Sequence, residues 1–193
     1  MGLSDYLRVT VRSRADWRAW LEKNHQQPGS IWLVTYKKSS GGPHVPYGDI
    51  VEEALCFGWI DSRPAKLDDE RSMLLLSPRK RRSAWSALNK ERVARMEAAG
   101  LMHAAGRKKI EVAKADGSWD ALNEVDQLIV PEDLRAALAA RNGAAKNFEA
   151  FPRSVKRGIL DWIRSARREE TRAKRVVKTA ELAAENRRAQ FGN

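Results

Sequence analysis

Acid, base, amide and tryptophan side chains are concentrated within residues 55–89, where two apolar runs end. An aspartate that is buried beside a tryptophan can have a raised pKa, as a general acid or base requires. Loops at the ends of regular elements commonly carry binding residues. The pattern therefore predicts a polar pocket lined by tryptophan, in a ligand-binding protein or an enzyme. The candidate pocket residues are Trp59, Asp61, Arg63, Arg79, Trp85 and Asn89.

The same residues also have structural interpretations. Asp61 could pair with Arg63 or Arg79, or it could cap a backbone turn. Trp85 and Asn89 are four positions apart in a segment with helical signals, so they are expected to share one helix face. On that face the tryptophan could belong to the core, and the asparagine could join two helices by a hydrogen bond.

A run of four basic residues, Arg79, Lys80, Arg81 and Arg82, precedes Ser83, where the sequence predicts the start of a helix. The N-terminus of a helix carries partial positive charge and free N–H groups, so it favours anions. The run therefore predicts an anion-binding site, with a solvated basic loop as the alternative.

A second candidate anion-binding set lies near the C-terminus, where arginines recur at helical spacing. They would share one face only if the helices there were continuous. Glu169 and Glu170 favour a new helix start, which would break that face. A docked helical hairpin with a solvated outer face is the alternative. The arginines of this set are Arg164, Arg168 and Arg172.

The overall charge supports an anionic partner. The 193 residues carry a net charge of +11, and the pI is about 10.1. Residues 153–193 hold twelve basic and five acidic residues, whereas residues 1–70 hold nine and ten. Such a balance favours nucleic acid or anionic lipid, with charge that only keeps the protein in solution as the alternative.

Several classes of site and location are not expected from the sequence. Cys56 is the single cysteine and the three histidines are far apart, so neither a disulfide nor a metal site is expected, and no cofactor motif occurs. The acidic turn at residues 68–70 is better explained as a solvated turn than as a cation site. No signal peptide is recognisable, and no apolar run approaches the ~20 residues of a membrane span. We expect a cytoplasmic protein.

Periodicity and turn signals predict an α+β fold, with a small, mostly antiparallel sheet and flanking helices followed by an all-helical module. Strands are expected at residues 7–11, 31–38, 59–67 and 72–76. A linker near residues 117–131 separates the two parts. We therefore expect a mixed domain over residues 1–122 and a helical module over residues 123–193.

The chain resembles the bacterial YdeI/OmpD-associated, or bacteriocin-protection, proteins. The motifs that carry the resemblance are LCFGWIDS, KLDDER, SPRK, SAWSALNKERV, AKADGSWDAL and the C-terminal run that begins PEDLRAALAA. The resemblance implies a bacterial cytoplasmic protein linked to stress resistance against bacteriocins or cationic peptides. It implies no catalytic residues.

Three functional hypotheses follow. The leading one is a non-enzymatic binding protein that contacts an anionic partner, with nucleic acid as one candidate, through residues 79–82 and the C-terminal arginines. The second is a small-ligand-binding protein or enzyme that uses the predicted pocket. The third is an adaptor whose helical module docks a protein partner. The sequence leaves the oligomeric state open.

Overall fold

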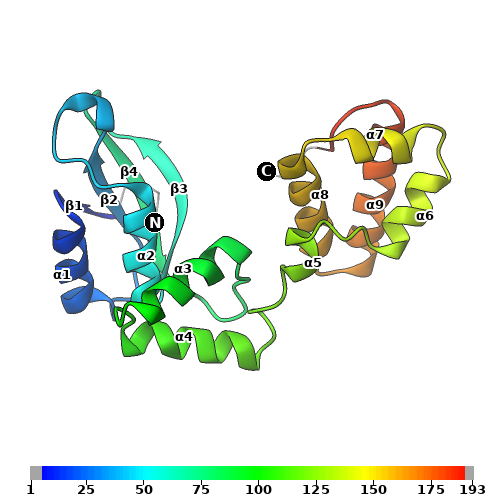
Figure 1. The fold of residues 1–193 in the computed structure, drawn as a ribbon. Helices are drawn as coiled ribbons and strands as arrows, with labels where there is room; N and C mark the ends of the chain where they lie inside the picture. The colour runs from blue at the N-terminus through cyan, green and yellow to red at the C-terminus, as the bar shows by residue number, and fades with distance from the viewer. Residues whose placement is uncertain (1–5, 190–193) are drawn as a thin grey trace. The chain divides into compact units, whose positions relative to one another are not determined.

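The structure is a computed structural model that describes residues 6–189. The chain divides into two compact units, residues 1–121 and residues 122–193. Figure 1 shows the fold coloured along the chain. The predicted fold class is confirmed, because a mixed sheet with flanking helices comes first and an all-helical region follows.

The described part of the N-terminal unit contains one four-stranded sheet with the strand order β1-β2-β4-β3. The first two strands pair in parallel, and the other two pairings are antiparallel. A parallel pair needs a crossover connection, which the first helix provides. The strands are β1 (Leu7–Thr10), β2 (Ile31–Tyr36), β3 (Trp59–Lys66) and β4 (Arg71–Pro78).

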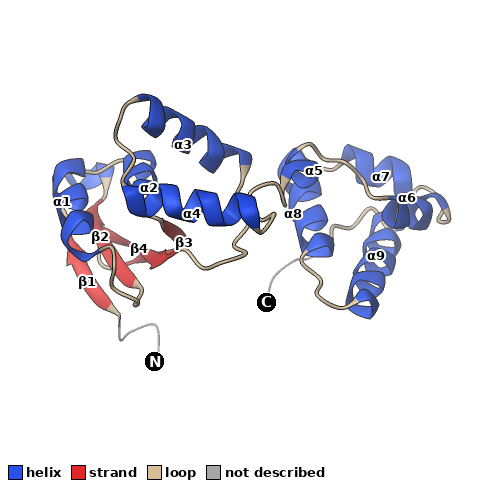
Figure 2. Cartoon of the chain, turned by 90° about the horizontal axis from the view of Figure 1, so that it is seen from below, coloured by secondary structure: helices blue, strands red, loops and turns tan. Residues whose placement is uncertain are grey.

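Two helices, α1 (Arg14–Asn24) and α2 (Tyr47–Cys56), lie on one face of this sheet (Figure 2). Ser13 is the N-cap of helix α1, and its hydroxyl accepts the N–H of Asp16 at 3.0 Å. Trp17 and Leu21 of this helix are fully buried in the core that the sheet and α2 complete. The unit also contains η2 (Lys38–Ser40), α3 (Ala87–Ala98) and α4 (Ala104–Ala115).

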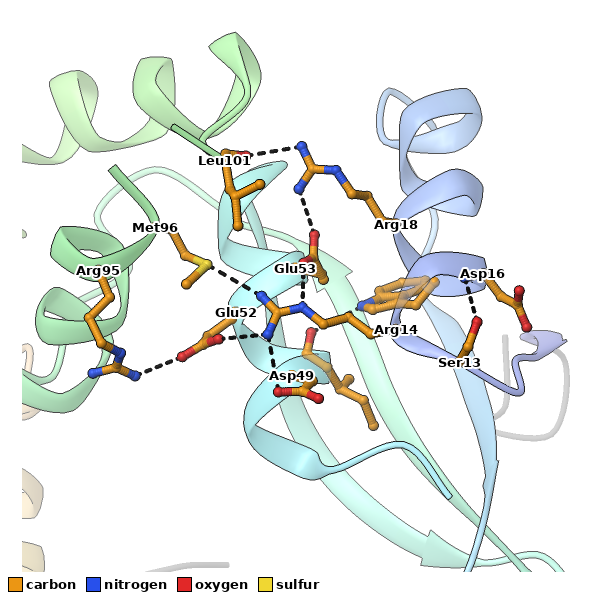
Figure 3. A network of polar contacts seen from close by, with 12 residues as sticks. Ser13, Arg14, Asp16, Arg18, Asp49, Glu52, Glu53, Arg95, Met96 and Leu101 are labelled. Carbon is orange, nitrogen blue, oxygen red and sulfur yellow. Dashed lines mark hydrogen bonds and ion pairs between the residues drawn. The ribbon is translucent and has the colours of Figure 1, made fainter. Parts of the chain in front are cut away.

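A polar network joins α1, α2 and α3 within the N-terminal unit (Figure 3). Arg14 contacts Glu53 at 2.7 Å and Glu52 at 3.1 Å. Arg18 contacts the other oxygen of Glu53 at 2.8 Å, and Arg95 contacts Glu52 at 2.7 Å. Each buried carboxylate therefore has two arginine partners, so the network serves to hold the helices together.

The C-terminal unit consists of helices in its described part. Buried side chains from several of them, including Leu134, Phe148, Ile159 and Val176, form its interior. The helices are α5 (Asn123–Asp126), α6 (Glu132–Ala139), α7 (Ala144–Ala150), α8 (Arg153–Arg164) and α9 (Glu169–Ala184). The helix start expected at Glu169 is found, and it separates α9 from α8.

One sequence-based expectation was wrong. The helix expected from Ser83 begins only at Ala87, because Ser86 is the residue that caps it, accepting the N–H of Asn89 at 3.3 Å. Trp85 therefore precedes the helix and does not share a helix face with Asn89. Part of the segment expected to link the two parts, residues 117–131, forms the short helix α5, whose Val125 is buried.

Candidate functional site

The N-terminal unit contains a pocket of about 580 Å³. Four segments form its wall: the α1–β2 connection, the junction of α2 with β3, the segment after β4, and α4 with the turn that follows it. Such a volume lies within the range of small-molecule sites, about 300–1,000 Å³. The main apolar lining residues are Pro28, Phe57, Pro78, Val112 and Ala113.

Two glycines allow the pocket wall to form. Gly58 lies between α2 and β3 with a φ of 77°, which a residue with a side chain rarely adopts. Its carbonyl accepts the N–H of Arg79 at 2.9 Å, which places the end of β4 beside this junction. A Cβ on Gly106 would lie 2.2 Å from the carbonyl oxygen of Cys56, so α4 can approach the end of α2 only because residue 106 is glycine.

The segment after β4 is held by hydrogen bonds to the turn after α4. The N–H of Arg82, a residue with a φ of 59°, donates to Asp116 at 3.2 Å. The N–H of Trp85 donates to the carbonyl of Ser118 at 3.3 Å. These bonds replace the helix that the sequence predicts at Ser83 and turn residues 79–86 into a loop along the pocket.

Arg79 is the most unusual residue of this loop. It is only 2% exposed, and its guanidinium carbon lies 3.6 Å from the centre of the Trp85 ring. Its Nη2 donates to the carbonyl of Ala84 at 2.5 Å. Within the part of the chain that the structure describes, its Nε and Nη1 have no hydrogen-bond partner. Burial lowers the pKa of Arg79 to about 10, against the opposing effect of Asp61, so the side chain remains cationic at neutral pH.

Two further buried donors in the pocket wall lack partners among the described residues: the indole Nε1 of Trp85 and the hydroxyl of Ser118. The Ser118 hydroxyl is close enough to Asp116 to lower the pKa of that carboxyl. The hydroxyl nevertheless forms no hydrogen bond among the described residues. Buried polar groups are normally hydrogen-bonded, so three such side chains in the wall of one pocket make it a candidate binding site.

The charge of the pocket lining is strongly positive. Six lysine and arginine side chains line it, against the single carboxylate of Asp116 among the lining residues described. That carboxylate already accepts the N–H groups of Arg82 and Ser118. Cations around a concave site raise the local concentration of anions. The six are Arg79, Lys80, Arg81, Arg82, Lys108 and Lys109.

The structure brings only part of the predicted pocket together: Arg79 and Trp85 line the cavity, and four of the candidates do not. Trp59 is buried in the core, where its indole N–H donates to the carbonyl of His25 at 2.9 Å. Arg63 is exposed on β3. Asp61 and Asn89 lie outside the cavity, in contact with Tyr47 and Arg92 respectively.

Asp61 and Asn89 belong to a separate polar cluster at the surface. Asp61 accepts the hydroxyl of Tyr47 at 2.6 Å. Burial, followed by this bond to Asp61, raises the pKa of Tyr47 to about 12. Asn89 accepts a hydrogen bond from Arg92 at 2.9 Å, and Arg92 lies over the Tyr47 ring. The cluster ties α3 to the start of α2, and its polar groups satisfy one another.

The predicted C-terminal set is largely committed to carboxylates. Arg164 contacts Asp161 at 2.8 Å. Arg172 holds both oxygens of Asp133, at 2.7 and 3.0 Å. Arg168 is exposed and stands at the N-cap position of α9. Two of the three arginines therefore have a structural role within their own unit.

Sequence reasoning missed the contribution of α4 and its following turn to the pocket. Lys108, Lys109 and Ser118 line the same cavity as the basic run but lie about thirty residues beyond it in the sequence. The pair of adjacent lysines was a visible signal, but only the fold shows that it belongs to the same site. No group of three or more histidine, cysteine or acidic side chains suited to a metal ion occurs among residues 6–189.

The geometry defines a two-unit protein in which a small α+β unit carries a cationic pocket and a helical unit follows. Residues 9–109 match the model of a domain family of unknown function, DUF8412, so the chain, just over half of which is covered, belongs to that family. Residues 127–186 match the family described as Bacteriocin-protection, YdeI or OmpD-Associated. The predicted family is thus confirmed for the helical unit, while the motifs near residues 55–89 fall in the first match. No curated protein and no solved structure matched the chain.

None of the helices in the described residues has the length and apolar character required to cross a membrane.

Proposed function

We propose that this protein is a binding protein for anions and that the pocket around Arg79 is its binding site. The observation that carries the proposal is the buried guanidinium of Arg79, with its Nε and Nη1 uncommitted among the described residues. A buried charge without a partner typically costs several kcal/mol. The contact with Trp85 offsets part of this cost, about 2 kcal/mol for a desolvated pair. A bound anion would offset the remainder.

The surroundings of Arg79 support an anion over a cation or a neutral ligand. Lys80, Arg81 and Lys108 are exposed beside the pocket. Their charges attract an anion from solution, and the buried arginine then holds it where water screens the charges least. We propose that this site binds an anion without catalysing a reaction on it.

Nucleic acid remains an alternative partner, because Lys80, Arg81 and Arg82 are exposed and adjacent in sequence. A nucleic acid would contact these outer side chains through phosphates, and its affinity would fall steeply with added salt. Arg164 and Arg172 each contact a carboxylate of their own unit, through pairs that are partly exposed. We favour the pocket as the binding site.

The proposal can be tested by urea unfolding of the full chain in inorganic phosphate and in chloride of equal ionic strength. A ligand that binds only the folded state stabilises it, by about 1.4 kcal/mol when its concentration is tenfold above Kd. Phosphate also stabilises proteins without specific binding, so the comparison with a variant is essential. Arg79→Met removes the charge but keeps an apolar stem against Trp85.

We expect phosphate to stabilise the parent more than Arg79→Met, while the variant alone unfolds within about 1 kcal/mol of the parent because a buried unpaired charge is lost. Arg8→Met is the matched control, since Arg8 is an exposed arginine of β1 that does not line the pocket. This control should respond to phosphate as the parent does. An equal response of Arg79→Met and Arg8→Met would refute the proposal.

A further inference from the structure

We infer that the ligand of this pocket is a small organic anion, with its charged group at Arg79 and an apolar body against Phe57, Pro78 and Val112. The inference rests on the proposed function and specifies its ligand class. It goes beyond anion binding because it excludes an inorganic ion and a polymer as the principal ligand. It is supported by the size of the cavity, the apolar part of its wall and the kind of polar groups left uncommitted.

The cavity is too large for a simple anion. A volume of about 580 Å³ is typical of sites that enclose a whole organic molecule, and such sites combine apolar walls with a few polar groups that fix the orientation. Here Phe57, Pro78, Val112 and Ala113 provide apolar surface next to the cationic side chains. An inorganic phosphate would leave this surface in contact with water, whereas an organic body would cover it.

The uncommitted polar groups are donors, so a ligand that pairs with them must supply hydrogen-bond acceptors. Arg79 and the Trp85 indole can only donate, and the Ser118 hydroxyl can donate as well. The carboxylate of Asp116, by contrast, already accepts two backbone N–H groups. A matching ligand therefore presents several acceptor oxygens and few donors. Carboxylates and phosphate esters both meet this requirement.

Ligand entry requires a local shift, because the uncommitted donor atoms of Arg79, Trp85 and Ser118 are covered by other atoms of the chain. The residues between Arg79 and Ser86 form no helix or strand, so this loop is the part of the wall that can move with the least loss of backbone hydrogen bonds. Binding should consequently alter the environment of Trp85.

Calorimetric titration of the full chain with four probes tests the inference. Phenyl phosphate and benzoate combine an aromatic body with an anionic group, inorganic phosphate lacks the body, and benzyl alcohol lacks the charge. We expect at least one aromatic anion to bind about tenfold or more tightly than both inorganic phosphate and benzyl alcohol. The tighter of phenyl phosphate and benzoate identifies the anionic group.

Two variants test the donors in the wall. Trp85→Phe keeps a ring for Arg79 but removes the indole N–H, and Ser118→Ala removes the hydroxyl. Each should weaken binding of the aromatic anion by roughly threefold to tenfold. Trp162→Phe, in the helical unit, is the control and should not change the affinity. Unchanged affinity in both pocket variants would overturn the inference.

The remaining outcomes separate this inference from the proposed function. Inorganic phosphate that binds as tightly as phenyl phosphate, and that needs Arg79, would overturn the organic ligand but leave anion binding standing. A deoxythymidine oligonucleotide that binds more tightly than every small probe, without requiring Arg79, would overturn the pocket in favour of the outer cations. No binding of any anion by the parent would overturn both.

Discussion

The central carbon of the Arg79 guanidinium lies 3.6 Å from the centre of the Trp85 ring. Both residues belong to the same irregular segment, between the end of β4 and the start of α3. The contact holds a positive charge inside the N-terminal unit while leaving Nε and Nη1 of the guanidinium uncommitted among the described residues. This contact with a ring, in a side chain that forms no ion pair among the described residues, is the basis of the proposed anion site.

The close approach of α4 to α2 predicts the effect of a methyl group at position 106. In a helix, replacing glycine by alanine usually stabilises by about 0.5–1 kcal/mol. A Cβ at Gly106 would lie 2.2 Å from the Cys56 carbonyl oxygen, so Gly106→Ala should instead destabilise by about 1–3 kcal/mol. Gly48→Ala is the control, because nothing lies within 4 Å of that Cβ. Urea unfolding measures both, and equal effects would contradict the packing described.

Much of the fold follows from local sequence signals. The β-branched run at residues 31–36, the capping Ser13 and the glycine after α2 each predict an element or a boundary that the structure contains. These signals suffice because each acts on neighbouring residues, through periodicity, a capping bond or a permitted φ.

The pocket could be predicted only in part, because contacts between segments that are distant in the sequence determine which residues line it. Ser83 and Ser86 are equally good capping residues in sequence, and the bond from Trp85 to the carbonyl of Ser118 selects the later start. That choice places Trp85 in a loop and separates it from Asn89. Lys109 and Ser118 enter the site through the packing of α4, which no local pattern encodes.

The buried Glu53 should be more important for stability than other carboxylates of the same unit. Its side chain is 2% exposed and contacts Arg14 and Arg18. Glu53→Gln removes the negative charge that both arginines contact. Because the arginines are partly exposed, we expect the free energy of unfolding to fall by about 2–3 kcal/mol. Glu22→Gln also removes a partner of Arg18, but Glu22 is 54% exposed, so its effect should stay below about 0.5 kcal/mol. Equal losses in denaturant unfolding would show that the network is not structural.

The capping residue of α4 predicts a pH effect. The Nδ1 of His103 accepts the N–H of Ala105 at 3.2 Å, and burial, followed by the charges of His25 and Arg18, lowers the pKa of His103 below 6.5. The unfolded chain therefore takes up this proton first. The contribution of His103 to stability is complete above pH 6.5 and decreases as the pH falls toward the lower pKa of the folded state.

His103→Asn tests this prediction, because asparagine caps helices well and does not titrate. The stability of the parent relative to the variant should decrease between about pH 7.5 and pH 5. Parallel pH profiles of the two proteins, measured by urea unfolding, would contradict the assignment.

The boundary expected between residues 122 and 123 remains a proposal about independent folding. The described chain divides into compact units between residues 121 and 122, and each unit has buried side chains of its own. We expect fragments of residues 1–121 and 122–193 each to unfold cooperatively, with circular dichroism spectra that add up to that of the full chain. A fragment without a cooperative transition would show that its fold depends on the other unit.

Contact between a bound anion and Arg79 can be observed at the arginine side chain itself. A nuclear magnetic resonance titration of ¹⁵N-arginine-labelled protein with phenyl phosphate follows the Nε–H of each arginine, and Arg79→Met assigns the signal of Arg79. A hydrogen bond to an anionic oxygen is stronger than one between neutral groups. The account predicts that the Arg79 signal shifts in a saturable manner, while that of the paired Arg172 stays unchanged. A saturable binding event that leaves the Arg79 signal in place would contradict it.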